Sequence, residues 1–299
     1  MVEPHSLGGY DLVTSDAVCQ IPNCVEGLAN TKTSQFHFQE WIDSIMSQFS
    51  PQSLKNQFDL DGLTFIPSFR SQLEVGDIQN NLDRVIQNVV PTMPAEHVFY
   101  EDKQDRSSLK QLQNLHLHDD YFGQLMTDSP FQKLAETLLD SKVVCKNMQY
   151  FNKPPKSGLP TPPHQDGYYF KISPCEAITM WLALEPVDHE NGCVRYIPKS
   201  HLKSMRPHGS TGTLGFSQGI TDFPNADDTA KEIAYPAQPG DLLAHHALTI
   251  HRATANHSPN RTRKAIGLIY YREDAREDSK ARAAYQSQLL AEMNAKQRI

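Results

Sequence analysis

The stretch TPPHQDGYYF, residues 161–170, places a histidine and an aspartate two positions apart just after a proline-rich turn. Side chains two positions apart on a strand point to the same side of it. A nitrogen of His164 and a carboxylate oxygen of Asp166 could therefore bind one metal ion from one face. A His-x-Asp pair also occurs by chance in surface loops, so on its own it is a weak indication of a metal site.

A third ligand lies downstream in PGDLLAHHALTIH, residues 239–251, a turn followed by a strand with a histidine at its end. Alternation puts His245 on the face of His251 and His246 on the opposite face, where a packed structural histidine is expected. Two histidines and one carboxylate leave three coordination positions open, as in non-haem iron sites. We therefore predict a metal site that joins His251 to the histidine and aspartate of the first stretch.

Around these stretches, from about residue 143 onward, short apolar or alternating runs are separated by Pro, Gly, Asn and Asp. The runs are VVCKNMQYFN, AITMWLALEPV, CVRYIP, EIAYPA, DLLAHHALTIH and KAIGLIYY. Such spacing predicts an antiparallel sandwich or barrel. Residues 207–230, rich in Gly, Ser, Thr and Asp, interrupt the strands and are too long for a hairpin, so we expect a lid or binding loop there.

Helical patterns lie mostly upstream of these strands and are expected to pack on the outside of the sheet. In residues 72–90 apolar side chains recur at spacings of three and four, which predicts an amphipathic helix. Ser129 followed by Pro130 is typical of a helix start. Further helices are expected at 36–48, 53–58 and 275–298, and a strand that closes on a turn at 63–69.

Composition limits the range of partners. The chain has 299 residues, a formal net charge of −7 and no long basic run, so neither a nucleic-acid surface nor an anionic-membrane surface is indicated. No run of 18 apolar residues and no secretory or peroxisomal signal is seen. The five cysteines are scattered and odd in number, which favours a reduced, cytoplasmic protein.

A basic residue follows the distal histidine. The stretch PNRTRKAIGLIYY begins a strand next to the predicted metal, and an arginine there could hold the far end of a dicarboxylate with its planar fork. Arg263 opens this strand, and Arg261 lies two residues earlier. We favour Arg263, while Arg261 stays an alternative.

Taken together, these elements resemble the phytanoyl-CoA dioxygenase family, which includes ectoine hydroxylase. The matching elements occur in order over about residues 55–272: FNKPPKSG, HQDGYYF, the strand of Trp181, EPVDHENGCVRYIPKSH, PGDLLAHHALTIH and RKAI. The resemblance implies a mainly β fold with flanking helices, a double-stranded β-helix or jelly-roll barrel of the cupin type. Residues 35–299 would form one oxygenase domain with its jelly-roll core at about 143–272, and residues 1–34 a loosely ordered extension.

The resemblance also implies roles for single residues. His164, Asp166 and His251 match the family's iron ligands. Arg263 matches the residue that binds the tail carboxylate of 2-oxoglutarate, and Trp181 lies where the family has a tryptophan near this co-substrate. Asn152 matches a position that contacts 2-oxoglutarate in some members. Where the family often has a small hydroxyl residue this chain has Ala253, so the neighbouring Thr254 is expected to replace it.

The implied activity is that of a dioxygenase dependent on Fe(II), 2-oxoglutarate and O2. It would hydroxylate an unactivated carbon of a small substrate and release succinate and CO2; other oxidative outcomes, such as desaturation, stay open. Asp166 favours hydroxylation over halogenation, because halogenating relatives lack this carboxylate. Tyr168, Tyr169 and Lys171 could contact a polar or anionic substrate, although at least one of the tyrosines could simply pack in the barrel.

Two other functions fit a jelly-roll with this triad. One is a metal-dependent hydrolase or isomerase with a different metal, against which the arginine at the dicarboxylate position argues. The other is a non-catalytic binding or sensor module, against which the intact triad argues. Consumption of 2-oxoglutarate would separate both from an oxygenase. The expected partner is a small-molecule substrate, and the expected assembly a monomer or homodimer.

Overall fold

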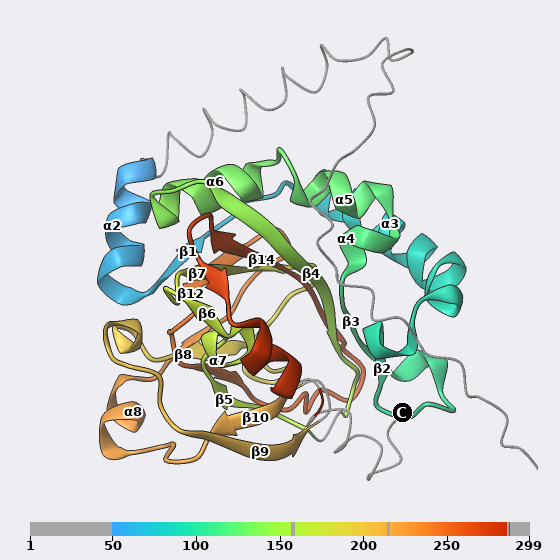
Figure 1. Cartoon of the computed structure of the whole chain (residues 1–299). Helices are drawn as coiled ribbons and strands as arrows, with labels where there is room; N and C mark the ends of the chain where they lie inside the picture. Colours follow the sequence, from blue (N-terminus) through green and yellow to red (C-terminus); the bar gives the residue numbers. More distant parts are fainter. Residues whose placement is uncertain (1–49, 157–158, 214–215, 286, 288–299) are drawn as a thin grey trace, which may run out of the picture. The chain divides into compact units, whose positions relative to one another are not determined.

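The computed structural model describes residues 50–156, 159–213, 216–285 and 287. The extension predicted for residues 1–34 and the helix predicted for 36–48 lie outside these residues. Within them, the chain forms two main antiparallel sheets with helices packed around them (Figure 1).

The larger sheet has seven strands, and most of them come from the part of the chain that was predicted to be β-rich. Its spatial order is β1 (Leu63–Ile66), β12 (Leu242–His246), β7 (Ala177–Ala183), β14 (Arg263–Arg272), β4 (Val143–Lys153), β3 (Leu109–Leu112) and β2 (Val98–Tyr100). Every residue of β7, AITMWLA, is buried, because helices cover one face of the sheet and a second sheet covers the other. A continuous apolar run is what such a doubly covered strand requires.

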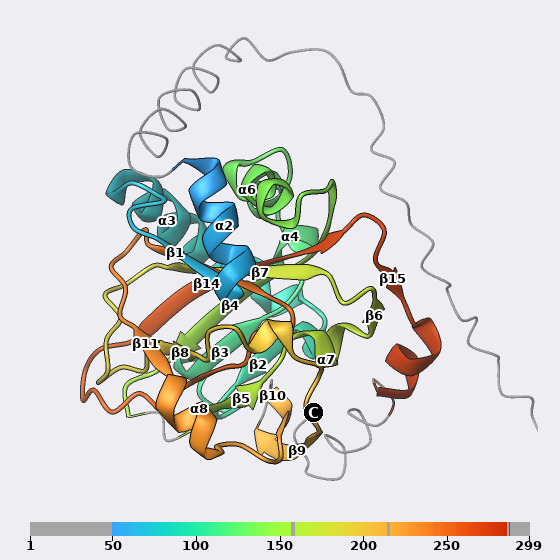
Figure 2. The same cartoon turned by 90° about the vertical axis from the view of Figure 1, so that its left-hand side faces the viewer.

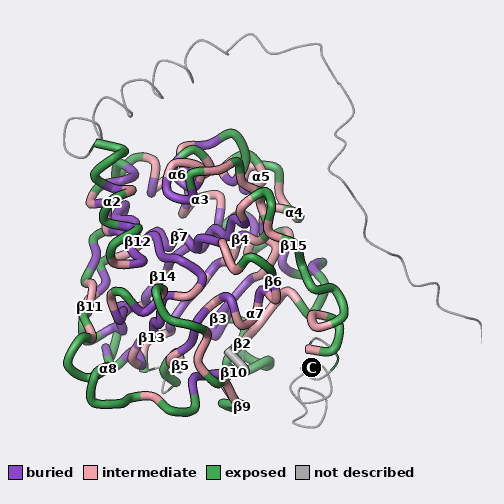
Figure 3. Tube along the Cα trace, turned by 60° about the vertical axis from the view of Figure 1, so that its left-hand side comes forward, coloured by how far each residue is buried: buried purple, intermediate pink, exposed green. Residues whose placement is uncertain are grey.

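The second sheet has four strands and supplies two of the predicted metal ligands. Its order is β11 (Ile233–Tyr235), β8 (Val194–Tyr196), β13 (His251–Ala253) and β5 (Thr161–His164). The core between the sheets joins Trp181, Leu243 and Ala265 of the larger sheet to Val194 and Tyr196 of the smaller one. Figure 3 shows these strands as the buried part of the chain, with exposed connections around them. The arrangement is the predicted jelly-roll.

The helices form where the sequence carries capping signals. Ser71 caps α3 (Gln72–Asn88) in a capping box with Glu74, and Ser129 caps α6 (Pro130–Leu139). Helix α6 packs on β4, β7 and β14 (Figure 1). The remaining helices before the core are α2 (Pro51–Asp61), η1 (Val90–Thr92), η2 (Ala95–His97), η3 (Arg106–Ser108), α4 (Leu115–His118) and α5 (Asp120–Met126).

The strand predicted near residue 63 pairs with a strand from the C-terminal part of the chain. β1 pairs with β12, with Leu63 opposite His245. Just before it, Gly62 ends α2 at a φ of +75°, and its carbonyl accepts hydrogen bonds from the backbone N–H of His246 and from the hydroxyl of Thr249. The larger sheet thus includes strands that lie upstream of the core range 143–272.

The expectation of one long loop at residues 207–230 was wrong. This segment forms the antiparallel pair β9 (His208–Thr213) and β10 (Phe216–Ile220), followed by helix α8 (Ala226–Lys231). Its glycines and hydroxyl residues lack the apolar alternation by which half-buried strands are recognised. Asn225 caps α8 in a capping box with Asp228, a signal that was readable from the sequence.

The last described segment lies beside the short helix α7 (Gly167–Phe170), as Figures 1 and 2 both show. β15 (Arg276–Glu277) pairs with β6 (Ile172–Ser173). Residues 279–285 are helical, as predicted for part of the tail, but the expected helix start at residue 275 was wrong, because β15 occupies that stretch. η4 (Ser200–Leu202) completes the described elements.

Candidate active site

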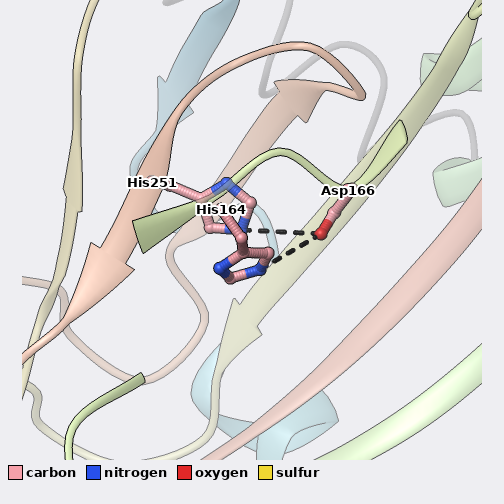
Figure 4. A group of neighbouring side chains, drawn as sticks. All are labelled: His164, Asp166 and His251. Atoms are coloured by element: carbon pink, nitrogen blue, oxygen red, sulfur yellow. Dashed lines mark ion pairs between the residues drawn. The ribbon is translucent and has the colours of Figure 1, made fainter. Parts of the chain in front are cut away.

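The predicted metal ligands lie together between the two sheets (Figure 4). Oδ1 of Asp166 is 3.3 Å from Nε2 of His164 and 3.7 Å from Nε2 of His251. One donor atom from each of the three residues lies within 4.8 Å of the others. His164 is 1% and His251 is 9% exposed, so the group is shielded from bulk water.

Strand pairing brings the two histidines together. His251 and His164 are direct partners in the pairing of β13 with β5, and cross-strand partners share a face. The chain positions differ from those predicted. His251 begins β13, while β5 ends at His164, and Asp166 caps α7 with helical φ and ψ of −57° and −34°. The prediction that His164 and Asp166 share one strand was therefore wrong: a tight strand-to-helix turn brings them together.

Backbone carbonyls orient both imidazole rings. Nδ1 of His164 lies 2.8 Å from the carbonyl oxygen of Pro162, and Nδ1 of His251 lies 3.0 Å from that of Thr249. A carbonyl only accepts hydrogen bonds, so each Nδ1 carries the proton and donates it. With Nδ1 engaged in this way, Nε2 is the ring nitrogen that faces the site and could bind a metal.

Asp166 is held by its other carboxylate oxygen. The hydroxyl of Thr179 donates to Oδ2 at 2.6 Å, and Nε2 of His245 lies 3.1 Å from Oδ2. The hydroxyl of Tyr196 lies 3.0 Å from Nδ1 of the same histidine. Oδ1 is thereby left to face the two ligand histidines. Alternation had placed His245 on this face, but no sequence signal marked the roles of Thr179 and Tyr196.

The charges suit a divalent cation. Burial raises the pKa of Asp166, but the proximity of His251 and the contacts with His164 and His245 outweigh it, and the pKa lies well below its ordinary value. Burial, followed by the proximity of His164 and His245, holds the pKa of His251 well below its ordinary value. One carboxylate and two imidazoles whose donor atoms face one another match the donor set of a non-haem iron site.

An arginine without an acidic partner lies on the neighbouring sheet. Arg263 opens β14, is 4% exposed, and has its guanidinium carbon 5.5 Å from the centre of the Trp181 ring. Its buried Nε has no hydrogen-bond partner, and no acid of the described segments forms an ion pair with it. Burial lowers the pKa of Arg263 to about 10, so it stays charged at neutral pH. It is a cation that fits an incoming carboxylate.

The alternative arginine is already paired. Arg261 forms ion pairs with Asp188, at 2.8 Å, and with Glu190, and its side chain is 37% exposed. A guanidinium held by two surface carboxylates is less suited to a buried ligand. The two arginines thus differ in both burial and pairing: Arg263 is buried, and Arg261 is bound to surface acids.

Asn152 and Thr254, the other two residues expected near the co-substrate, make contacts that do not involve Arg263 or the three candidate metal ligands. The Asn152 amide donates to the carbonyl of Leu109 at 2.9 Å, and its buried Oδ1 is unpaired. In the pairing of β4 with β14, Asn152 is opposite Lys264, the residue after Arg263. Because side chains alternate along a strand, Asn152 points to the face of the sheet opposite to that of Arg263. Thr254 follows β13, and its carbonyl oxygen lies against Gly192.

Of the three residues expected near the substrate, Tyr169 contacts His164, Tyr168 packs beside Tyr169, and Lys171 lies over Tyr168. Tyr169 packs on His164 with ring centres 5.7 Å apart, and its hydroxyl donates to the carbonyl of Gln218. Tyr168 stacks on His208 at 4.3 Å, and the Lys171 ammonium lies 3.6 Å from the centre of the Tyr168 ring. The residues belong to α7 and its C-cap, not to a strand as expected. Sequence reasoning missed His208.

Comparison with known proteins is consistent with this geometry. Residues 58–265 match the family described as phytanoyl-CoA dioxygenase (PhyH). The chain belongs to this family. The match spans both sheets and includes the three ligand residues, so the family fold and the candidate site coincide.

Curated family members match over different lengths. The peroxisomal phytanoyl-CoA dioxygenase of Rattus norvegicus is 30% identical over 152 residues, which are 48% of this chain and 44% of the rat protein. The chain thus matches less than half the length of that relative. A probable alpha-ketoglutarate-dependent hypophosphite dioxygenase of Stutzerimonas stutzeri is 25% identical and covers 68% of this chain and 72% of its own length.

Solved structures share the fold. The epimerase SnoN, determined with Fe3+, alpha ketoglutarate and nogalamycin RO, superposes with a TM-score of 0.62 at 24% identity, over 76% of this chain and 85% of SnoN. EctD from S. alaskensis, determined with 2-oxoglutarate and 5-hydroxyectoine, has a TM-score of 0.60 at 19% identity, over 73% of this chain and 74% of EctD. At such identities the likeness shows the jelly-roll fold.

Proposed function

We propose that this family member is an Fe(II)- and 2-oxoglutarate-dependent dioxygenase. It would use O2 to hydroxylate an unactivated carbon of a small, polar or anionic substrate, with release of succinate and CO2. The observation that carries the proposal is the joint presence of two features. Three donor atoms that could hold a metal face one another between the sheets, and a buried arginine that has no acidic partner among the described residues opens a strand of the larger sheet.

Each part of the site has a task in this proposal. Nε2 of His164, Nε2 of His251 and Oδ1 of Asp166 would hold the iron, while Thr179 and His245 hold the carboxylate in place. Iron and 2-oxoglutarate, once bound, supply the oxidising chemistry. Arg263 would hold the far carboxylate of the co-substrate, and the ring of Trp181 would shield that contact from water.

The side chains of Tyr168, Tyr169 and Lys171, which lie beside His164, support the proposed substrate class. The Lys171 ammonium lies over the Tyr168 ring, and among residues 50–285 that the structure describes no carboxylate forms an ion pair with it. An anionic group of the substrate could therefore bind the ammonium, while the neighbouring aromatic rings contact the apolar part of the substrate.

Asp166 supports hydroxylation over halogenation, because its carboxylate would occupy the position that a halide needs. An epimerase and a carbocyclase share the fold, so the product itself must be identified. Mass spectrometry that finds a gain of one oxygen atom would support hydroxylation, and a loss of two hydrogen atoms would identify desaturation instead.

The rival functions make different predictions. A hydrolase or isomerase would turn over substrate without 2-oxoglutarate, and a sensor module would bind ligand without consuming it. The decisive experiment adds 2-oxoglutarate to the Fe(II)-loaded protein without O2 and records the visible charge-transfer absorption of the chelate. O2 and candidate substrates are then added and succinate is measured. No chelate absorption and no succinate with any substrate would contradict the proposal.

The setting of the protein is also a proposal. No described helix has the length and apolarity needed to cross a membrane. Within the described part of the chain, Cys175 and Cys193 form no disulfide, which supports a reducing, cytoplasmic location. We propose a monomer or homodimer that binds neither nucleic acid nor membranes. Cell fractionation and light scattering test the location and the assembly.

A further inference from the structure

A second buried cation lies next to Arg263. Lys153 is the last residue of β4 and is paired directly with Arg263, the first residue of β14. Cross-strand partners point to the same face of a sheet. Lys153 is 6% and Arg263 is 4% exposed. The structure thus places two basic side chains side by side in a buried environment.

These side chains leave the sheet on the face that looks toward the smaller sheet. Ala265, two residues after Arg263, belongs to the core between the sheets, and Phe151, two residues before Lys153, packs against that core. Residues two apart on a strand share a face. Lys153 therefore projects to the same side of the larger sheet as the arginine that would hold the co-substrate.

The acids near this pair do not neutralise it. Nζ of Lys153 donates to the carbonyl of Leu159 at 3.3 Å, and within the described part of the chain no carboxylate forms an ion pair with it. Glu101 is the acid that acts on Lys153, and it already pairs with Lys110 at 3.0 Å. Burial raises the pKa of Cys193, the thiol near Arg263, so this group stays neutral at pH 7.

Two neighbouring cations repel each other strongly when buried. Burial, together with the charges of Arg263 and Lys110, lowers the pKa of Lys153 to about 6. At neutral pH, Arg263 is charged and Lys153 is mostly a neutral amine. A carboxylate that bound Arg263 would offset the repulsion and would also offer an acceptor to a charged Lys153.

We propose that Lys153 is a second anchor for the far carboxylate of 2-oxoglutarate and takes up a proton from solvent when that carboxylate binds. This inference rests on the proposed function, because it assumes that 2-oxoglutarate is the ligand of Arg263. Lys153 is a positioning residue in this account and has no part in the oxidation itself.

The sign of the pH dependence follows from linkage. An anion that binds beside Lys153 raises its pKa, so one proton is taken up at any pH between the free and the bound pKa. In that range, the dissociation constant of 2-oxoglutarate increases by up to about tenfold for each unit of rising pH. Below about pH 6, where Lys153 is already charged in the free protein, this dependence disappears.

NMR spectroscopy of protein with 13C-labelled lysine measures the titration directly. Zn2+ fills the metal site in this experiment, because it is diamagnetic and does not activate O2. The spectrum of Lys153→Met identifies the Lys153 signal. We expect a midpoint near pH 6 without 2-oxoglutarate and an upward shift of at least one unit with it. An ordinary lysine midpoint in the free protein, or a midpoint that 2-oxoglutarate does not move, would overturn the inference.

Calorimetry supplies an independent measurement. Binding of 2-oxoglutarate to the Zn2+-loaded protein is followed in buffers with different heats of ionisation, which reveals the number of protons taken up. We expect uptake of about half a proton or more at pH 6.5 for the wild type and none attributable to this site for Lys153→Met. Loss of a charge-assisted hydrogen bond should weaken binding by Lys153→Met about tenfold or more at pH 6.

Lys264→Met is the matched control, because Lys264 follows Arg263 on β14, pairs with Glu185 at 3.4 Å and belongs to the opposite face. It should bind 2-oxoglutarate and take up protons like the wild type. If Lys153→Met does not fold, the pH dependence of wild-type binding between pH 5 and 9 decides alone, and a flat profile rejects the inference.

The two proposals fail in different ways. If wild-type protein loaded with Zn2+ or Fe(II) does not bind 2-oxoglutarate, the proposed function and this inference both fail. If it binds 2-oxoglutarate but Lys153→Met matches the wild type in affinity and in proton uptake, only the role of Lys153 is rejected.

Discussion

His164 and His251 lie directly opposite each other on paired strands, with ring centres 4.1 Å apart and both Nδ1 atoms bound to backbone carbonyls. The backbone pairing of β5 with β13 thus sets the distance between two ligand atoms. A metal site built in this way is largely pre-formed, and its affinity should depend on each of its three donors.

Removal of a donor should abolish metal binding. We expect His164→Ala, His251→Ala and Asp166→Ala each to lose tight Fe(II) binding, because two remaining donors hold this ion weakly. Anaerobic titration with Fe(II) measures the effect. His257→Ala, at an exposed histidine, is the control and should bind like the wild type. Unchanged Fe(II) affinity in Asp166→Ala would contradict the assigned ligand set.

The two arginines near the start of β14 should differ sharply. Arg263→Met removes the buried cation and should weaken 2-oxoglutarate binding by about 10- to 100-fold, the effect of losing a hydrogen bond to a charged group. Arg261→Met removes a surface cation that is already paired and should change binding by less than about threefold. Calorimetry with Zn2+-loaded protein compares them, and a larger effect at Arg261 would reverse the assignment.

The hydroxyl of Thr179 should increase metal affinity although it does not bind the metal itself. Thr179→Val keeps the size of the side chain but removes the 2.6 Å hydrogen bond to Oδ2 of Asp166. Loss of such a contact typically lowers metal affinity about 10- to 100-fold. Thr179→Ser retains the hydroxyl and should keep most of the affinity. Equal metal affinity in the valine and serine variants would show that this contact does not matter.

A histidine outside the site should make stability depend on pH. Burial, with the nearby His118, lowers the pKa of His116 to about 4, and its Nδ1 accepts a hydrogen bond from the backbone N–H of Met148. The unfolded chain binds the proton near pH 6.5, so stability falls as the pH drops from about 6.5 to about 4. Partial exposure limits the loss to about 1 kcal/mol.

Urea unfolding of the protein at a series of pH values tests this dependence. His116→Asn keeps an acceptor near the position of Nδ1 but cannot be protonated. We expect a smaller loss of stability between pH 6.5 and pH 4 in this variant than in the wild type. If the free energy of unfolding fell equally with pH in the variant and in the wild type, groups other than His116 would cause the loss of stability at low pH.

Two glycines should respond in opposite directions to alanine. Gly240 has a φ of +95°, and a Cβ atom there would lie 2.1 Å from the carbonyl oxygen of Arg70. Gly240→Ala should therefore destabilise the fold by about 2 kcal/mol or more. Gly76 is in the middle of α3 with nothing within 4 Å of such an atom, and Gly76→Ala should stabilise by about 0.5–1 kcal/mol. Thermal unfolding of both variants compares them.

Local signals made much of the fold predictable. The apolar spacing at 72–90 and the Ser129–Pro130 pair each predicted a helix that the structure contains, because capping and amphipathicity are properties of neighbouring residues. The apolar run of β7 was recognised in the same way. For the candidate site, the ordered stretches around His164 and His251 were enough to predict which three donors meet.

Contacts that depend on strand register could not be read from the sequence. Nothing near Lys153 indicates that it pairs with Arg263, because this pairing joins residues far apart in the chain. The strand-to-helix turn at Asp166 was missed for a related reason: a short apolar run does not show where a strand ends. The polar hairpin of β9 and β10 lacked the alternation that reveals half-buried strands.

The hydrogen bonds to the carbonyl of Gly62 determine how much of the chain is needed to build this site in another protein. This carbonyl binds the N–H of His246 and the hydroxyl of Thr249, two residues before a metal ligand. A fragment that begins at residue 143 would keep all three ligand residues. It would lose these two hydrogen bonds and the neighbouring strand β1. The shortest fragment that keeps the site intact therefore begins upstream of residue 62. Shorter fragments should contain all three ligand residues but should not hold His251 in position.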